Sequence, residues 1–385
     1  MEQSPLNPYA AQPDFTFWRR AVSGRSLSDI DPVVEVPFRI SVGDQVATAG
    51  SCFAQHISRT LIREGLSYLV TEPAPGTRAA VNEGYGVFPA RFGNVYTVRQ
   101  LLQLFLRAYG VFEPVDRVWL TEGGQLIDPF RPRIQQGGFA TVSDLEADRA
   151  YHLAAVRRMF EECDVFVFTL GLTEGWVSNR DEAVFPLDRG VTGSAGPREW
   201  YRPQNFTVAE MYTDLTGFVD KLRAVNQSVK IILTVSPVPL IATFEHRHVL
   251  TSTIYSKCAL RVVAEMVTKA RDGIVYFPSY EIITGPQSKS CFFEDDLREV
   301  TAEGVTHVMD IFKKHFIQSE VSELTHTSDT PFESETGKVS QSVKLAEAPV
   351  APPDTGGRAT QGWSRLEEIE KVICDEEVIV RDLDS

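Results

Sequence analysis

The stretch Val46-Ala-Thr-Ala-Gly-Ser51-Cys-Phe-Ala-Gln-His56 predicts a short apolar strand that runs directly into a helix. Gly50 and Ser51 stand at the junction. A serine placed there has its hydroxyl at a sheet edge, beside the backbone N–H groups of the helix N-terminus, which suits a nucleophile whose oxyanion needs donors. Serine is also a favoured helix N-cap. The position alone therefore leaves two interpretations of Ser51, nucleophile or cap.

The same alternation of strand and helix continues to about residue 318. Buried strands are predicted at 46–49, 165–170, 230–235 and 274–277, and helices at 52–65, 97–109, 144–162, 207–225, 254–271 and 301–316. The strands read as continuous Val, Ile, Phe and Leu runs, which is typical of strands buried on both faces. This pattern predicts an α/β fold in which a central parallel sheet lies between two layers of helices.

Composition divides the 385 residues into a folded part and an acidic tail. We predict an extended N-terminal lead over residues 1–36 and a single domain over residues 37–318. Residues 319–362 are dominated by Ser, Thr, Glu, Pro and Gly, a composition that predicts a disordered linker. Residues 363–385 predict a short acidic amphipathic helix that docks on a protein partner or on the domain itself. A weakly structured tail without a role is the alternative.

Charge and cysteine content narrow the function classes. The net charge is −14, and the tail from residue 319 carries 15 acidic against six basic side chains, so the folded part gives no support for nucleic-acid binding. No apolar run is long enough to span a membrane, and the N-terminus lacks a secretory pattern. Five dispersed cysteines favour a reducing, cytoplasmic location. Phosphate-loop, dinucleotide and metal-ligand spacings are missing from the sequence, so no cofactor and no metal are expected.

Polar or glycine-bearing turns follow each predicted strand. They are Gly50-Ser51, Gly171-Leu-Thr-Glu-Gly-Trp176, Ser236-Pro-Val-Pro239 and Pro278-Ser-Tyr-Glu281. Ligands of parallel sheets bind outside the carboxyl ends of the strands. The sequence therefore predicts a site at this edge of the sheet.

Blocks of sequence over roughly residues 35–317 resemble the GSCFA family, a bacterial branch of the SGNH (GDSL-like) hydrolase superfamily, and its proteobacterial type in particular. The blocks are Gly50-Ser-Cys-Phe-Ala54, Gly86-Val-Phe-Pro-Ala-Arg-Phe-Gly-Asn-Val-Tyr-Thr97, Asp128-Pro-Phe-Arg-Pro132, Phe168-Thr-Leu-Gly-Leu-Thr-Glu174, Thr234-Val-Ser-Pro-Val-Pro-Leu240, His248-Val-Leu250, Ser256-Lys257 and Tyr276-Phe-Pro-Ser-Tyr-Glu281. The resemblance implies an SGNH-like, flavodoxin-like three-layer sandwich.

The resemblance also implies roles for residues of the first three blocks. Ser51 matches the nucleophile, and its own backbone N–H is one oxyanion donor. Gly93 matches the glycine of the second block, and the amide of Asn94 lies next to it. In the third block the superfamily has Gly-x-Asn-Asp, whereas this chain has Gly171, Thr173 and Glu174.

The last block departs further from the superfamily. Asp296-Leu-Arg-Glu299 stands where Asp-x-x-His is expected, so Glu299 takes the position of the general base. A carboxylate accepts a proton from serine poorly unless burial raises its pKa. We therefore expect His248 to be the base, with Asp296 or Glu299 orienting it, because His56 and His307 fall on helical faces.

Arg91 and Trp176 are further binding candidates. Arg91, like Arg131 and Arg133, lies in a loop where it could grip an anion, although salt bridges within the loops are the plainer interpretation. Trp176 and Tyr280 could stack on a sugar ring or cap the core.

These residues predict a serine ester hydrolase or O-acyl(acetyl)transferase acting on a small-molecule or glycan ester through an acyl-Ser51 intermediate. A polysaccharide precursor is the favoured substrate by analogy with the superfamily. The alternative is a non-catalytic glycan-binding or adaptor protein that keeps the SGNH fold, with the acidic helix as its contact to a protein partner.

Overall fold

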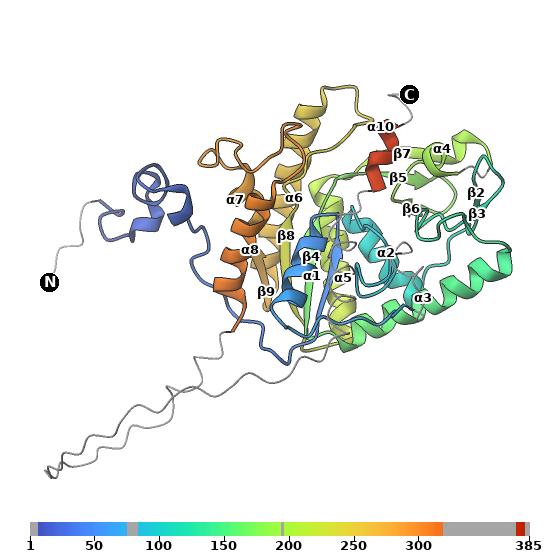
Figure 1. The fold of residues 1–385 in the computed structure, drawn as a ribbon, viewed down its shortest axis with the longest axis horizontal. Coiled ribbons are helices and arrows are strands. Elements are labelled where there is room, and N and C mark those ends of the chain that lie inside the picture. The colour runs from blue at the N-terminus through green and yellow to red at the C-terminus, as the bar shows by residue number, and fades with distance from the viewer. Residues whose placement is uncertain (1–6, 75–83, 194–195, 319–374, 382–385) are drawn as a thin grey trace, which may run out of the picture. The chain divides into compact units, whose positions relative to one another are not determined.

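The computed structural model describes residues 7–74, 84–193, 196–318 and 375–381, and a parallel four-stranded sheet lies at its centre (Figure 1). The strands lie in the order β1 (Val46–Gly50), β4 (Val165–Leu170), β8 (Lys230–Val235) and β9 (Ile274–Phe277), and each neighbouring pair is parallel. Beyond β1, Tyr68 forms a parallel bridge to Val46, which gives the flavodoxin-like order of strands. The predicted α/β fold is confirmed.

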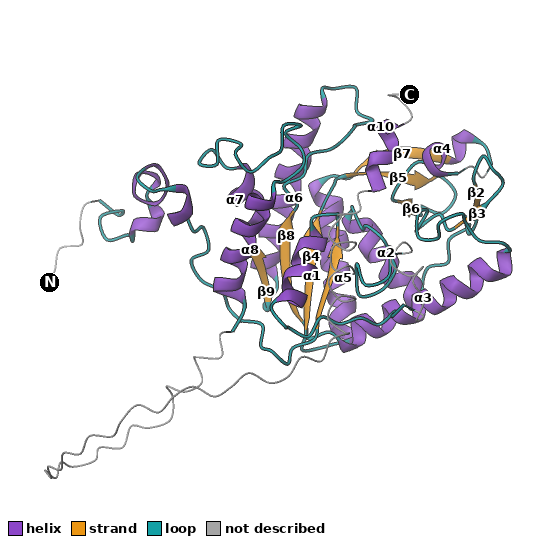
Figure 2. Ribbon diagram, in the orientation of Figure 1, coloured by secondary structure: helices purple, strands orange, loops and turns teal. Residues whose placement is uncertain are grey.

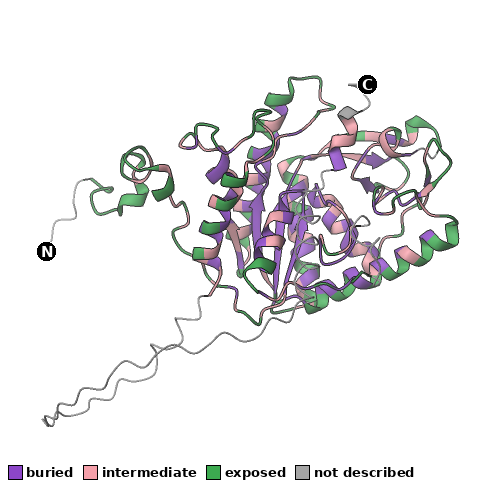
Figure 3. Cartoon of the chain, viewed as in Figure 1, coloured by how far each residue is buried: buried purple, intermediate pink, exposed green. Residues whose placement is uncertain are grey.

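Helices cover both faces of this sheet because successive side chains of a strand point to opposite faces (Figure 2). Phe166 and Phe168 pack in one apolar layer, and Val165 and Val167 in the other. The first layer includes α2 (Val98–Ala108), α3 (Val142–Glu162), α5 (Val208–Val225) and α6 (Val249–Ala270). The second includes α1 (Ala54–Arg63), α7 (Ser279–Thr284) and α8 (Ala302–Phe316). Figure 3 shows the strands buried between the two layers.

Side-chain caps decide where several helices begin. Thr97 and Thr207 form capping boxes with Gln100 and Glu210 at the starts of α2 and α5. α6 begins at Val249, five residues before the start predicted from the apolar pattern, because His248 caps it.

Two small antiparallel sheets were not anticipated. β5 (Glu174–Ser178) lies between β6 (Val184–Phe185) and β7 (Tyr201–Asn205). β2 (Trp119–Leu120) pairs with β3 (Leu126–Ile127). The remaining elements are short helices: η1 (Asp14–Thr16), η2 (Arg19–Ser23), η3 (Leu27–Asp29), α4 (Arg189–Thr192) and η5 (Arg198–Trp200).

The C-terminal end contributes one further described segment. It comprises the 3-10 turn η7 (Asp375–Glu377) and the single helical turn α10 (Val378–Arg381), and it belongs to the same compact unit as residues 1–317. The predicted linker over 319–362 and the greater part of 363–385 lie outside the described residues. Within the described ranges, every helix is too short or too polar to cross a membrane.

Candidate active site

Ser51 lies at the carboxyl end of β1 and is 4% exposed. Its Oγ has no hydrogen-bond partner among the described residues. The N-cap position of α1 is Phe53, without a side-chain capping bond, so the interpretation of Ser51 as a helix cap is wrong. Leaving a buried hydroxyl unsatisfied costs about 1–3 kcal/mol. Such groups call for an explanation, and chemistry at the hydroxyl is one.

Two glycines let the backbone close around Ser51. Gly50 has a φ of 142°, and a Cβ added to it would lie 2.4 Å from the carbonyl oxygen of Thr169 in β4. A Cβ added to Gly171 would lie 2.9 Å from Ser51 Cβ. The N–H of Ser51 donates to Thr169 O at 3.3 Å. The amide predicted to serve the oxyanion is therefore already engaged between the strands, a correction to the sequence prediction.

The Gly93-Asn94 turn lies against the strand end that carries Ser51. The N–H of Val95 donates to Gly50 O at 2.8 Å, and Gly93 has a φ of 71°, which glycine adopts without strain. Asn94 is 4% exposed, and its Oδ1 accepts a long hydrogen bond of 3.4 Å from Gln55 Nε2. This contact orients the amide nitrogen of Asn94 away from α1. The predicted oxyanion-donor position is thus held close to the end of β1.

The turn after β4 supplies three of the predicted residues. The N–H groups of Gly171 and Leu172 both donate to Tyr96 O, at 3.2 and 2.9 Å. Thr173 is fully buried, its N–H donates to Ser256 Oγ at 3.1 Å, and its own Oγ1 has no described partner. Glu174 instead accepts hydrogen bonds from Thr243 Oγ1 at 2.7 Å and from the N–H of Phe244 at 3.1 Å. Its carboxylate holds the loop after β8.

The Asp296–Glu299 turn does not supply a base. Both side chains are exposed, and Asp296 Oδ1 accepts the backbone N–H groups of Arg298 and Glu299 at 2.9 and 3.0 Å. Glu299 is exposed whereas Ser51 is buried, so the predicted role of Glu299 as the base is not supported. The turn instead presents Arg298, whose side chain is 14% exposed.

His248 has a structural task. It is exposed, and its Nδ1 accepts the N–H of Leu250 at 3.1 Å as the cap of α6. This bond requires the Nδ1 lone pair, so the neutral ring carries its proton on Nε2 and has no free basic nitrogen in this position. The geometry corrects the prediction of His248 as the general base.

Lys257 is a site residue that the prediction missed. It is 1% exposed, and its Nζ donates to Gly171 O at 2.7 Å. Burial lowers its pKa to about 8, opposed by attraction to Glu376 and Cys52. Its place in the Ser256-Lys257 block was the signal in the sequence.

Arg91 is buried rather than open to a ligand. Its Nη1 donates to Asp148 Oδ1 at 2.9 Å and to the hydroxyl of Tyr85 at 3.0 Å, and its Nη2 donates to Ile134 O at 2.9 Å. Its backbone N–H donates to Glu72. The ion-pair interpretation is correct for this arginine, and its predicted contact with substrate is not supported.

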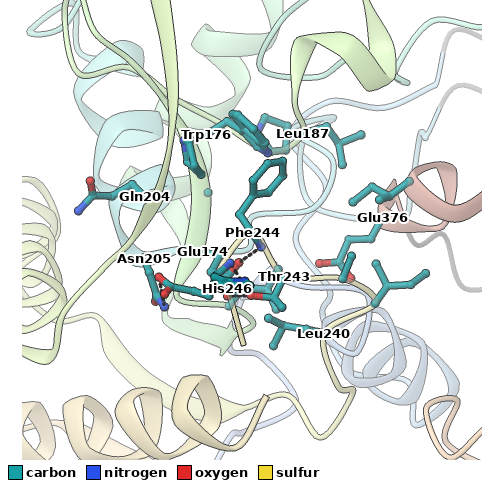
Figure 4. Close-up of a pocket in the computed structure, with 18 residues that line it drawn as sticks. Glu174, Trp176, Leu187, Gln204, Asn205, Leu240, Thr243, Phe244, His246 and Glu376 are labelled. Carbon is teal, nitrogen blue, oxygen red and sulfur yellow. Dashed lines mark hydrogen bonds between the residues drawn. The ribbon is translucent and has the colours of Figure 1, made fainter. Parts of the chain in front are cut away.

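Trp176 lines a pocket of about 270 Å³ between the β5 sheet and the loop after β8 (Figure 4). Its ring lies edge-to-face with that of Phe244, with the ring centroids 4.2 Å apart. Leu172, the residue after Gly171, also lines this pocket, and Glu376 and Ile379 of the C-terminal segment form part of its wall. Tyr280 lines a different pocket, together with Trp18. Nowhere in the described ranges do three His, Cys, Asp or Glu side chains gather as a metal site requires.

One known protein family matches most of this chain. The model of the GSCFA family matches residues 45–312, and the chain therefore belongs to that family. No match was found among curated proteins. A solved structure of Clostridium thermocellum family 3 carbohydrate esterase is distantly similar, with 10% sequence identity and a TM-score of 0.30 over 71% of this chain and 94% of that one.

Proposed function

We propose that this protein is a serine-dependent ester hydrolase or O-acyltransferase that acts on a carbohydrate ester. The observation that carries the proposal is the buried hydroxyl of Ser51 at a strand end, which has no hydrogen-bond partner among the described residues and packs against Gly171. The Gly93-Asn94 turn is joined to the same strand end by the hydrogen bond from Val95 to Gly50. The neighbouring pocket, with Trp176 and Phe244 in its wall, has the aromatic surface that a sugar ring stacks on.

The reaction follows from these groups. Ser51 Oγ attacks the acyl carbon, and the amide of Asn94 donates to the oxyanion that develops. The ester C–O bond then breaks, and the departing alcohol takes up the proton that the serine lost. Water or a second hydroxyl attacks the acyl-Ser51 carbon, which frees Ser51 and yields the acid or a new ester.

We assign proton transfer to Lys257 rather than to His248. A pKa of about 8 leaves part of the lysine neutral at physiological pH, and its Nζ contacts the carbonyl of the residue that packs on Ser51. Catalytic hydrogen bonds often tighten only when substrate binds, so a contact between Ser51 and Lys257 is required in the complex and not beforehand.

A non-catalytic glycan-binding protein is the second candidate. Two observations favour it. The N–H of Ser51 is hydrogen-bonded to Thr169 O, and the position usually held by the base is taken by an exposed glutamate, Glu299. Under this alternative the pocket beside Trp176 binds a glycan without turnover.

Labelling of the intact protein by a fluorophosphonate probe separates the two candidates. The enzyme is labelled at Ser51, and Ser51→Ala abolishes labelling while leaving the fold intact. The esterase would be overturned, and the binding protein supported, if neither the folded wild type nor a folded Asp375→Ala/Glu376→Ala variant labelled or hydrolysed an aryl acetate. Thermal unfolding of the wild type and of Ser51→Ala supplies the control for folding.

A further inference from the structure

The acidic C-terminal segment Asp375–Ile379 lies on the groups that form the candidate active site. Asp375 Oδ2 accepts a hydrogen bond from Asn94 Nδ2 at 2.8 Å, and the N–H of Asp375 donates to the hydroxyl of Tyr96 at 3.2 Å. A Cβ on Gly93 would lie 3.9 Å from the same carboxylate oxygen. One carboxylate therefore meets both residues of the predicted oxyanion turn.

The next residue binds a second part of the site. Glu376 Oε2 pairs with Arg298 Nη2 at 3.1 Å, and both side chains are largely buried. Attraction to Lys257 adds to this pair. Glu376 also faces the pocket beside Trp176, as Figure 4 shows, and Ile379 supplies an apolar contact at its edge.

Burial of two adjacent carboxylates is costly unless cations and donors face them. Here Arg133 and Asn94 act on Asp375, and Arg298 and Lys257 act on Glu376. The pKa values of both carboxyl groups are raised, because desolvation outweighs these attractions. Donors and cations thus face both carboxyl groups, while the remaining desolvation cost weakens the docking of their ionised forms.

A carboxylate that is hydrogen-bonded to the side-chain amide of Asn94 hinders a substrate oxyanion from binding to the same amide. The nitrogen that bonds Asp375 at 2.8 Å is the one proposed to stabilise the tetrahedral intermediate, and a carboxylate at that distance takes up one of its N–H groups and repels a second anion beside it. Glu376 also stands in the wall of the neighbouring pocket.

We propose that the mouth of the site is a binding surface for an acidic peptide, and that the chain's own segment Asp375–Ile379 occupies it in competition with the substrate. Binding of an acidic peptide does not depend on the proposed esterase chemistry. Competition between the segment and the substrate rests on the proposed function. Release of the segment is then a condition for turnover.

The test uses the full chain with Asp375→Ala and Glu376→Ala together, which removes the competing carboxylates. A fluorescent peptide with the sequence of residues 372–385 is titrated against this variant and against wild type by anisotropy. A tethered ligand acts at a high effective concentration, so we expect the peptide to bind the variant at least about tenfold more tightly than wild type. Adding Arg298→Ala to the variant removes this binding.

The matched control is Glu367→Ala with Glu368→Ala, which makes the same charge change elsewhere in the tail. It should behave as wild type. Equal peptide affinity for wild type and the double variant, or no binding to either, would overturn the inference. Thermal unfolding confirms that each variant is folded. A wild-type dimer that dissociates in the double variant would assign the segment to a second copy and overturn the assignment to the same chain.

The enzymatic consequence is measured separately. Fluorophosphonate labelling of Ser51 should become at least about tenfold faster in the Asp375→Ala/Glu376→Ala variant than in the control. Peptide binding as expected, without labelling of any variant, would retain the binding surface and reject the esterase. Labelling of Ser51 without peptide binding would retain the esterase and reject the peptide-binding surface.

Discussion

Gly171 packs so closely on Ser51 that a Cβ added to it would lie 2.9 Å from Ser51 Cβ, a distance that side chains do not tolerate. The same added atom would lie 3.2 Å from Tyr96 O. The backbone after β4 thus sets the position of the candidate nucleophile.

Gly171→Ala should displace Ser51 from its present position. A displacement of about 1 Å can cost about 100-fold in rate, so we expect labelling of Ser51 by fluorophosphonate to slow by that order. Gly217→Ala is the control, since a Cβ there meets nothing within 4 Å. Unchanged labelling of a folded Gly171→Ala protein would contradict the proposed geometry.

Asn94→Ala should lower ester turnover by about 100-fold or more, equivalent to roughly 3 kcal/mol, through loss of the oxyanion donor. The substitution also removes the contact with Asp375, which alone would favour release of the C-terminal segment. Turnover is therefore compared in the Asp375→Ala/Glu376→Ala background, where that second effect is absent. Equal turnover with and without the amide in this background would rule out Asn94 as the donor.

Lys257→Met should change the rate of labelling at Ser51, whereas His248→Ala should change the stability of the fold. His248→Ala removes the cap of α6, so we expect a loss of about 1 kcal/mol in the free energy of unfolding with labelling unchanged. Lys257→Met should slow labelling by about 100-fold, the scale of general-base catalysis. Denaturant unfolding and labelling kinetics on the same samples distinguish the two, and the reverse pattern would return the role of base to His248.

Docking of the C-terminal segment should weaken as the pH rises. Burial raises the pKa values of Asp375 and Glu376 above their ordinary 3.8 and 4.5, so the docked carboxyl groups retain protons at a pH where the free ones have lost them. Docking therefore takes up protons and is favoured as the pH falls from neutrality toward the ordinary carboxyl range. Above about pH 8, loss of the Lys257 proton removes an attraction to Glu376 as well.

Anisotropy titrations of the peptide against the Asp375→Ala/Glu376→Ala variant, from about pH 5 to about pH 9, measure this dependence. The charged groups that face the two carboxyls are Arg133, Glu377, Arg298 and Lys257. We expect the affinity to fall steadily across the range. An affinity that increases toward alkaline pH would show that Arg298 outweighs desolvation and that the pKa values are lowered instead.

Much of the fold could be predicted because its signals are local. The apolar runs of β4, β8 and β9 begin and end at the predicted residues, since a strand covered on both faces needs an uninterrupted apolar sequence. The start of α6 could not be read from the apolar pattern, because a histidine cap replaced the usual Ser, Thr, Asp or Asn.

The sequence by itself determined the parallel sheet, its flanking helices and the position of Ser51 at the end of β1. The tertiary structure alone decided what surrounds that serine. In the folded chain Arg91 is buried in ion pairs, and His248 caps α6. Lys257 is buried against Gly171, and Asp375 bonds Asn94, which is 281 residues away in the sequence. Strand and helix periodicity arises between near neighbours in the chain, whereas burial, ion pairing and the filling of a site depend on contacts that no local pattern encodes.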